Sequence, residues 1–442
     1  MSRSAKFFRR LYEALLIVLM AAICLPAIAK AGSDEEAVYQ PIPAGTVITP
    51  QNWQNYKQYM TDGLQALFSD KYSWKIPANF QMDIGPGRHY SPPPEYVNNT
   101  EKYSGLVKII SIPPDRHSLT GYVAGLPFPN PQEPLKGWKM LMDAWYAYVP
   151  HISCTDDGKF ILTDRFGNSN STHWLLINRQ FSHISDAGFP IQDPAGPGLF
   201  NVQMFDIMLP EQARYTASLT IYYDQLDHNE DTFVFIPALR RTLRLSSGAR
   251  CSPQAGSDFA IDDTRQSTFN GNPTRFNATY VGDRGVIEMI QADVAKSADP
   301  SFFYMPIFYP KPEVGNWEVR DSYMLDVSRV PSEKAGYCYG RKRLYIDKEV
   351  FRSIWADIYD ENMHLWKVDY DPTAMISIPG EGSRWINNGW GAMIDIQNTH
   401  LTHVDFGPHG FWANQDCANV NGHDFTDAGQ YSSVKGLAQI MR

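Results

Sequence analysis

Residues 340–371, GRKRLYIDKEVFRSIWADIYDENMHLWKVDYD, limit the fold more than any other stretch of this chain. They read as three short strands separated by two polar turns, which is the pattern of an antiparallel meander. On the middle strand, Ile354 and Ile358 share one face and Trp355 and Tyr359 share the other, because side chains alternate along a strand. A sheet with bulky apolar groups on both faces must be covered on both, by helices or loops or by closing around a ligand.

The same period of two begins at about residue 157 and recurs through most of the later chain. Strands separated by Asn, Asp, Gly or Pro are predicted at 174–180, 200–209, 217–225, 232–236 and 318–330. Aromatic residues make up 13% of the chain and charged residues only 20%, with frequent Gly and Pro. This composition favours a large β-rich fold with many turns over a helical bundle.

Two helical segments are expected near the start of the chain. In the first, Thr49 is placed as the N-cap and Pro50 as the first helical residue, and apolar residues recur at spacings of three and four from Trp53 to Leu67. The second covers residues 133–148 with a less regular pattern. Both are expected to pack on the β-rich part, and YSPPPEY and GLPFPNPQEP between them are predicted to be loops.

The first 31 residues have the composition of a secretory signal peptide. A basic stretch, MSRSAKFFRRLYEA, precedes the uncharged run LLIVLMAAICLPAIA, which ends in small residues suited to cleavage. This run is shorter than the roughly 20 residues that a helix needs to span a bilayer. We therefore expect a signal peptide at 1–31 and export of residues 32–442 to the periplasm. An uncleaved membrane anchor is the alternative.

The acidic balance of the exported part argues against nucleic acid as a partner. The whole chain has 39 Lys and Arg residues and 48 Asp and Glu residues. The predicted signal peptide holds five of the basic residues and one of the acidic residues. The exported part therefore keeps 34 basic and 47 acidic residues, a formal charge of −13. Nucleic-acid binding needs basic surface that displaces counterions from phosphates.

Four cysteines remain in the exported part: Cys154, Cys251, Cys338 and Cys417. An oxidising compartment allows up to two disulfides among them, with three possible connectivities. None lies in a C-x-x-C pair, so a redox or zinc site has little support. Unpaired buried thiols are the alternative.

Four segments carry a resemblance to a known family: ITPQNWQNYKQYMTDG (48–63), VAGLPFPNP (123–131), FVFIPALRRTLRLSSGARCSPQAGSDFAIDD (233–263) and GRKRLYIDKEVFRSIWADIYDENMHLWKV (340–368). The chain resembles domain-of-unknown-function family 1329, the outer-membrane lipoprotein-sorting-like proteins of Gram-negative bacteria. That family is related in fold to the LolA/LolB-type periplasmic lipoprotein carriers. The last two segments are the most specific, and the tail after about residue 400 has no clear counterpart.

The resemblance implies a mainly β fold with a few helices (α+β), in which a large antiparallel sheet curls into an incomplete barrel and helices plug its mouth. One carrier-like domain would cover 32–442, with a helical and Pro-rich part at 32–156 and a β-rich part at 157–442. The implied role is non-catalytic: to carry a lipid or other hydrophobic molecule between membranes, without a cofactor. An inner-membrane exporter or an outer-membrane protein would be the partner, and the protein could associate with the outer membrane.

The segment TFVFIPALRRTLRLSS (232–247) supplies the candidate binding residues. If 239–246 is a strand, three leucines share one face and Arg240 and Arg244 the other, while Arg241 falls on the leucine face and Pro237 introduces a bend. The predicted cavity lining is Phe233, Phe235, Leu239, Leu243, Leu245, Tyr345 and Trp355, with Arg240, Arg241 and Arg244 as a rim for an anionic headgroup or acidic partner. Alternatively, the arginines lie on a solvated face and pair with Asp224, Asp227 or Glu230.

Other site chemistries find less support. His400, His403 and His409 lie near one another in sequence, but residues 400 and 403 of a strand point to opposite faces, so no metal site is predicted. The chain lacks the common hydrolase, metalloprotease and nucleotide-binding motifs, and no catalytic residue is assigned. A secreted carbohydrate-binding or polysaccharide-active β protein is the alternative, because a carboxylate pair and exposed Trp would suit sugars. A structural subunit of an envelope export complex is a third hypothesis.

Overall fold

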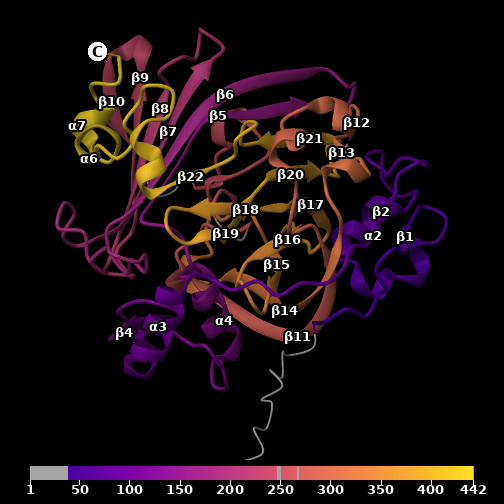
Figure 1. Cartoon of the computed structure of the whole chain (residues 1–442), viewed down its shortest axis with the longest axis horizontal. Helices are drawn as coiled ribbons and strands as arrows, with labels where there is room; N and C mark the ends of the chain where they lie inside the picture. The colour runs from indigo at the N-terminus through magenta and orange to yellow at the C-terminus, as the bar shows by residue number, and fades with distance from the viewer. Residues whose placement is uncertain (1–37, 246–249, 266–267, 442) are drawn as a thin grey trace, which may run out of the picture. The chain divides into compact units, whose positions relative to one another are not determined.

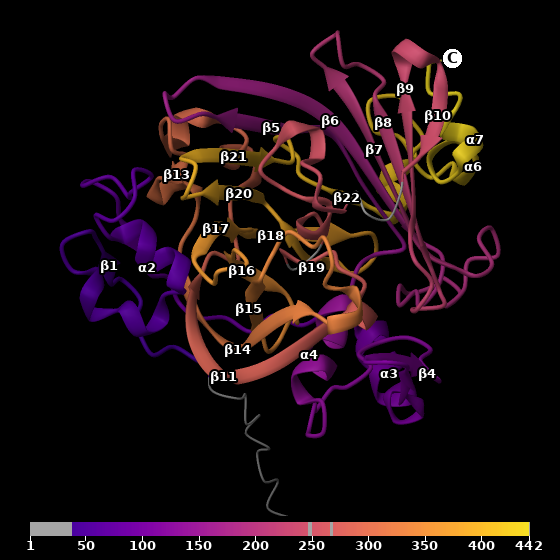
Figure 2. The ribbon, with the colours of Figure 1, turned by 180° about the vertical axis from the view of Figure 1, so that it is seen from behind.

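The computed structural model describes residues 38–245, 250–265 and 268–441. The predicted signal peptide lies outside these residues. From Tyr39 onward the chain forms one compact unit. Its dominant element is a fourteen-stranded sheet in which every pair of neighbours is antiparallel (Figures 1 and 2).

Thirteen strands follow one another across this sheet, and one short strand, β22 (Trp412–Ala413), pairs with β5 beside them. In order they are β10 (Arg241–Arg244), β9 (Asp231–Ile236), β8 (Ala217–Tyr223), β7 (Leu199–Leu209), β6 (Ser169–Gln180), β5 (Ile152–Thr163), β21 (His400–Asp405), β20 (Trp390–Asp395), β17 (Leu365–Tyr370), β16 (Ser353–Tyr359), β15 (Arg341–Asp347), β14 (Glu318–Arg329) and β11 (Phe276–Glu288). The sheet curls, but its two outermost strands, β10 and β11, do not pair with each other (Figure 2). The predicted mainly β fold with an unclosed antiparallel sheet is confirmed.

The predicted meander is present as β15, β16 and β17. Every residue of β16 is buried, so both faces are covered as the sequence requires. One detail of the prediction is wrong: a register shift between β15 and β16 interrupts the alternation before Trp355. Ile354 therefore packs in the same cluster as Trp355, whereas Ala356 and Ile358 pack on the opposite side.

Four two-stranded sheets and six α-helices complete the described residues. The small sheets are β1 (Val47–Ile48) with β2 (Met82–Asp83), β3 (Lys108–Ile112) with β4 (Arg116–Thr120), β12 (Phe303–Tyr304) with β13 (Tyr309–Pro310), and β18 (Thr373–Ile378) with β19 (Gly382–Asn388). The helices are α2 (Asp62–Phe68), α3 (Pro94–Tyr103), α4 (Lys136–Trp145), α5 (Val294–Ser297), α6 (Ala428–Tyr431) and α7 (Val434–Leu437).

The first predicted helix is much shorter than expected. The Asn52 side chain accepts a hydrogen bond from the Thr49 backbone N–H at 2.7 Å, and this local turn competes with an α-helix. Two 3₁₀ turns follow, and α2 begins only after Thr61, whose hydroxyl accepts from the Leu64 N–H at 3.0 Å. Thr61, and not Thr49, is thus the N-cap.

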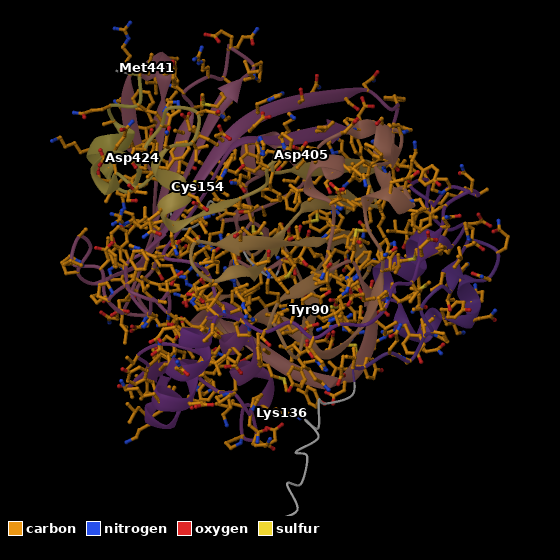
Figure 3. The ribbon with its side chains drawn as sticks, viewed as in Figure 1. Tyr90, Lys136, Cys154, Asp405, Asp424 and Met441 are labelled. Atoms are coloured by element: carbon orange, nitrogen blue, oxygen red, sulfur yellow. A yellow bond between two sulfur atoms is a disulfide. The ribbon has the colours of Figure 1, made fainter. Side chains whose placement is uncertain are left out.

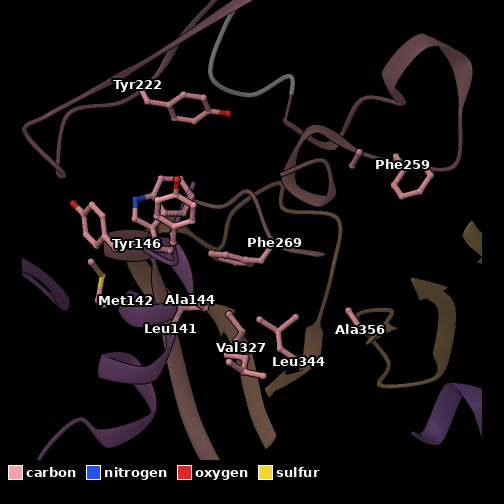
Figure 4. Packing of buried hydrophobic residues seen from close by; sticks show 14 of the residues in the cluster. Leu141, Met142, Ala144, Tyr146, Tyr222, Phe259, Phe269, Val327, Leu344 and Ala356 are labelled. Carbon is pink, nitrogen blue, oxygen red and sulfur yellow. The ribbon is translucent and has the colours of Figure 1, made fainter. Parts of the chain in front are cut away.

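The second predicted helix is present as α4, within the expected 133–148. It lies against β11 and β14, where Gly137 permits close contact: a Cβ there would stand 2.4 Å from the Ala278 carbonyl oxygen. Leu141 and Met142 on α4 pack in one cluster with Leu344 of the sheet (Figure 4).

A third helix, α3, arises where only a Pro-rich loop was predicted. Pro94 stands at its first turn, where a missing backbone N–H costs nothing. The YSPPPEY segment therefore contains a helix start. The hairpin of β3 and β4 was also not foreseen in this part of the chain.

Two disulfides link segments that are distant in sequence. Cys154–Cys417 joins β5 to the turn after β22, and Cys251–Cys338 joins two loops. Cys154 is labelled at the junction of β5 with the C-terminal segment in Figure 3. This resolves the three connectivities that the sequence left open.

Candidate functional site

A cavity lies over β5, β6 and β7. Its empty volume is about 950 Å³, including space open to solvent. Side chains on β6 and β7 point alternately into the cavity and into an apolar cluster on the opposite face of the sheet. Even-numbered residues of β6 from Trp174 to Gln180 face the cavity, whereas Leu175 and Ile177 face a separate apolar cluster on the other side.

One end of the cavity is built from aromatic rings. Trp174 lies 5.3 Å from Phe160, 5.4 Å from Phe205 and 5.7 Å from Phe406, measured between ring centroids. The ring series continues from Phe406 through Phe411 to Trp385. Phe259 completes this wall, stacked on Phe160. These rings present apolar surface with few polar atoms.

The other end of the cavity carries side-chain amides. The register of β6 and β7 places Leu176 opposite Phe205, then Asn178 opposite Gln203, then Gln180 opposite Asn201. The wall therefore changes from apolar to polar along the same two strands. The remaining amides of the lining are Gln254, Asn387 and Asn388.

Two of these amides are fixed by the backbone. Gln180 donates from Nε2 to the Val149 carbonyl at 3.0 Å, and Asn201 donates from Nδ2 to the Arg179 carbonyl at 3.2 Å. Because each amide can also accept, the polar end retains hydrogen-bonding capacity toward a bound molecule.

Arg265 adds a positive charge to this lining. Its guanidinium lies 3.9 Å from the Trp145 ring centroid and 5.2 Å from that of Phe200, which precedes Asn201 at the amide end. Burial lowers the pKa of Arg265 to about 10, so it remains protonated at neutral pH.

Two carboxyl groups also reach the cavity, and each has a structural partner. Asp263 accepts from Lys342 and from the Tyr339 hydroxyl. Burial raises the pKa of Asp371 to about 7, while the charge of Arg352 opposes this shift. The two acids are thus engaged within the fold, which is unlike the freely facing pair of a glycosidase.

The structure places the sequence-predicted binding residues elsewhere. Phe233 and Phe235 lie on β9 and pack in the cluster on the far side of the sheet from the cavity. Leu243 lies on the edge strand β10, and Leu245 follows it at the surface. None of the ten predicted side chains belongs to the cavity lining in the described residues. That these residues contact a ligand stays a prediction.

The predicted strand 239–246 begins later than expected. Pro237 starts a 3₁₀ turn that ends at Leu239, and Arg240 has a φ of 49° before β10 begins at Arg241. Leu239 is therefore exposed in a turn and not aligned with the other leucines. The predicted bend at Pro237 is present.

The arginines of this segment lie at the surface. Arg244 pairs with Asp231, while Arg240 and Arg241 are exposed. Two of the three acids proposed as alternative partners bind other groups: Asp224 pairs with His183, and Glu230 with Arg250.

Tyr345 and Trp355 lie in a cluster that is filled by side chains. The Tyr345 hydroxyl donates to Asp357 at 2.8 Å, and the Trp355 ring stacks on Tyr370 at 3.9 Å. We call this group of buried residues beneath α2, which also includes Trp317 and Trp390, the α2 cluster.

The three histidines do not converge. His400 binds Asp258 at 2.7 Å, His403 is buried 4.3 Å from the Phe308 ring centroid, and His409 lies beside Trp412. Burial lowers the pKa of His403 to about 3, so it is neutral at physiological pH. Among the described residues, no group of His, Cys, Asp and Glu is arranged to hold a metal ion.

The lining of this cavity was not predicted from the sequence. WLLINRQ and FNVQMF were recognised as strands, but their amides were not singled out. The available signal was the placement of Asn178, Gln180, Asn201 and Gln203 on the strand faces that also carry Trp174 and Phe205. Polar amides on an otherwise apolar face indicate a surface that is not closed by packing.

None of the helices in the described part of the chain has the length and apolar character needed to cross a bilayer. A family model described as Protein of unknown function (DUF1329) matches residues 47–419. No curated protein matches the chain.

Similar solved structures include a domain described as an outer membrane lipoprotein-sorting protein from Vibrio parahaemolyticus. It is 15% identical, with 64% of this chain and 96% of that chain covered and a TM-score of 0.44. A DUF1329 family protein from Desulfovibrio piger is 14% identical, with 66% and 98% covered and a TM-score of 0.45. A LolA superfamily protein from Nitrosomonas europaea is 13% identical, with 64% and 97% covered and a TM-score of 0.38.

Proposed function

The chain belongs to the DUF1329 family, and we propose that it is a periplasmic carrier that binds a lipid or other hydrophobic small molecule in the cavity over β5–β7. The carrier acts without catalysis and moves its cargo between membranes, with an inner-membrane exporter or an outer-membrane protein as its partner. The predicted signal peptide at 1–31 supports the compartment. The observation that carries the proposal is the cavity of about 950 Å³ with a wall of aromatic rings.

The energetics of such a cavity suit reversible binding. Each buried methylene contributes about 0.8 kcal/mol, so a long alkyl chain supplies a large gross affinity before ordering costs are subtracted. The wall is aromatic and apolar at one end, which suits an alkyl or ring system.

The carbohydrate alternative has less support from this geometry. Sugar binding would use exposed Trp and an open cleft with two facing carboxylates. Trp174 and Trp385 in the lining are each only 2% exposed, and Asp263 is bound to Lys342. The carrier is therefore the function that the cavity favours.

The test is a search for a co-purifying hydrophobe. The full chain is expressed with its own leader in a Gram-negative host and purified without detergent. Native mass spectrometry and organic extraction then identify any bound molecule. We expect a stoichiometric lipid or other hydrophobe in the wild type.

A matched pair of variants locates the binding. Leu176→Trp fills the cavity from β6, whereas Ser171→Trp adds the same ring at an exposed position of that strand. Ser171→Trp should retain the hydrophobe and Leu176→Trp should lose it, with both proteins folded by circular dichroism. A wild type without any extractable hydrophobe, or a folded Leu176→Trp protein that retains it fully, would overturn the proposal.

A further inference from the structure

Arg265, which lines the cavity, differs from Arg250, Arg320 and Arg329 in its partners. Arg250 pairs with Asp262 and Glu230, Arg320 with Asp347 and Glu349, and Arg329 with Asp262. By contrast, no carboxylate of residues 38–245, 250–265 or 268–441 forms an ion pair with Arg265. Arg265 is half-buried, so its charge is partly shielded from water, and an anionic ligand in the cavity would give this guanidinium a counter-charge.

Aromatic rings hold this guanidinium in place. It lies 3.9 Å from the Trp145 centroid, 5.2 Å from Phe200 and 5.6 Å from Tyr222. Tyr222 lies across from Tyr146 and the α4 residues in Figure 4. Within the described residues, Arg265 donates one long hydrogen bond, 3.5 Å from Nη1 to the Trp145 carbonyl. A guanidinium held by ring contacts keeps its in-plane N–H groups available for a forked contact with carboxylate or phosphate.

A second guanidinium reinforces the positive field. Arg352 donates from Nη2 to the Asn388 side chain at 2.7 Å, and Asn388 lines the cavity. Burial lowers the pKa of Arg352 to about 10, and the nearby charge of Arg265 acts in the same direction. Asp371 opposes this effect on Arg352. The charge of Arg265 is thus felt at Arg352, which lies near Asp371, an acid whose own pKa is raised to about 7.

The charge lies at the amide end of the cavity. The guanidinium of Arg265 contacts the Phe200 ring, and Phe200 directly precedes Asn201. In the sheet, Asn201 of β7 lies opposite Gln180, the last residue of β6. Trp174, at the aromatic end, is six residues away along β6, which corresponds to about 20 Å of strand. A molecule that spans the cavity would therefore meet a cation and amides at one end and rings at the other.

Building on the proposed carrier function, we propose that the cargo is an anionic amphiphile, whose carboxylate or phosphate is bound by Arg265 while its apolar tail lies against the rings around Trp174. The amides Gln180 and Asn201 complete the polar end. The edge-strand arginines at 240, 241 and 244 take no part in this recognition.

The experiment measures binding of three probes of equal chain length to delipidated protein: dodecanoate, dodecyl phosphate and dodecanol. Titration calorimetry is performed below the micellar range. We expect wild type to bind at least one anionic probe about tenfold or more tightly than dodecanol, since hydrogen bonds to charged groups are stronger than those to neutral groups. The tighter of the two anions distinguishes a fatty-acid head from a phosphate head.

Three variants complete the test. Arg265→Gln should abolish the preference for the anion and change dodecanol affinity less than twofold. Arg265→Lys, which keeps the charge and loses the fork, should retain part of the preference and serves if the glutamine variant does not fold. Arg244→Gln, at an exposed arginine outside the lining, should bind like wild type.

The outcomes separate the two proposals. If dodecanol binds and Leu176→Trp blocks it, but wild type shows no preference for either anion, the anionic head is refuted and the carrier stands. An unchanged preference in Arg265→Gln, or in Arg265→Lys where that variant replaces it, also refutes the role of Arg265. If none of the three probes binds, both proposals fail together.

Discussion

Two regions of this molecule are rich in aromatic residues, but one is tightly packed and the other lines a cavity. In the α2 cluster, aromatic rings fill the space: Tyr370 stacks on Trp355 at 3.9 Å and on Trp317 at 5.6 Å. Over β5–β7, rings such as Trp174 and Phe160 instead line one end of a cavity that is partly open to solvent. Aromatic content alone therefore does not indicate a binding cavity.

The difference lies in what accompanies the rings. On the cavity face, Asn178, Gln180, Asn201 and Gln203 interrupt the apolar wall, and burying them against hydrocarbon without partners would be costly. A surface that combines rings with amides remains open to solvent or to a ligand. The α2 cluster has apolar neighbours on α2, such as Leu64 and Leu67, and closes by packing.

The largest expected effect comes from removing a ring in the packed region. Trp355→Ala should lower the free energy of unfolding by about 3–5 kcal/mol, because Trp355 is 2% exposed and leaves a void. Leu176→Ala should cost less than the about 2–5 kcal/mol of a fully buried leucine, because Leu176 already faces the cavity and its removal leaves no new void. Urea unfolding of both variants measures the difference. Equal losses would mean that the cavity wall is as tightly packed as the α2 cluster.

The disulfide behind the cavity wall should have the next largest effect. The double variant Cys154→Ser with Cys417→Ser releases β5 from the segment after β22, which are 263 residues apart in sequence. Removal of such a link costs on the order of 3 kcal/mol. Urea unfolding should show this loss while ligand occupancy by native mass spectrometry persists. If the cargo is lost from the still-folded variant, then the two faces of the sheet are not independent.

A buried carboxyl on the far face of β7 predicts a pH effect. Burial raises the pKa of Asp206 to about 7, against a smaller opposing effect of Arg214. The folded state then retains a proton that the unfolded state releases near pH 4, so this group makes stability fall as pH rises from about 4 through 7.

Asp206→Asn removes that contribution. Between pH 5 and 7 the wild type should lose about 2 kcal/mol more than the variant, measured by urea unfolding at each pH. Other carboxyls with raised pKa values, Asp357 and Asp405, are unchanged in the variant and cancel in the difference. Parallel pH profiles would show that Asp206 ionises normally.

The smallest effect is expected at the basic edge strand. Arg244→Ala removes the ion pair with Asp231, and the Arg244 side chain is 64% exposed. An exposed pair contributes about 0–1 kcal/mol, so the midpoint of unfolding should hardly move. A loss above 2 kcal/mol would indicate that β10 is structurally more important than its exposure suggests.

The sequence predicted the sheet better than the site. Period-two alternation located β6–β9 and the β15–β17 meander because burial on one or both faces fixes the pattern locally. The prediction of a helix N-cap at Thr49 was wrong. There the Asn52 side chain accepts a hydrogen bond from the Thr49 backbone N–H, and the sequence pattern did not indicate this contact. The resemblance to the family correctly gave the membership and the unclosed sheet.

The site could not be predicted because the cavity depends on long-range pairing. The wall forms only when Asn178 meets Gln203 across two strands and Trp385 arrives from β19. The charge that faces it comes from Arg265 in a loop with no periodic pattern. The leucine–arginine segment 239–245 attracted attention by composition, yet it forms a turn and an edge strand.

Photo-crosslinking tests the central claim most directly. A fatty acid with a diazirine near the end of its chain is bound to delipidated protein, activated by light and mapped by peptide mass spectrometry. We predict that labels concentrate on peptides that contain Phe160, Trp174 and Phe406, and that Leu176→Trp abolishes them. Labels concentrated on β9 and β10, around Phe233 and Leu243, would contradict the account and return the binding site to the edge of the sheet.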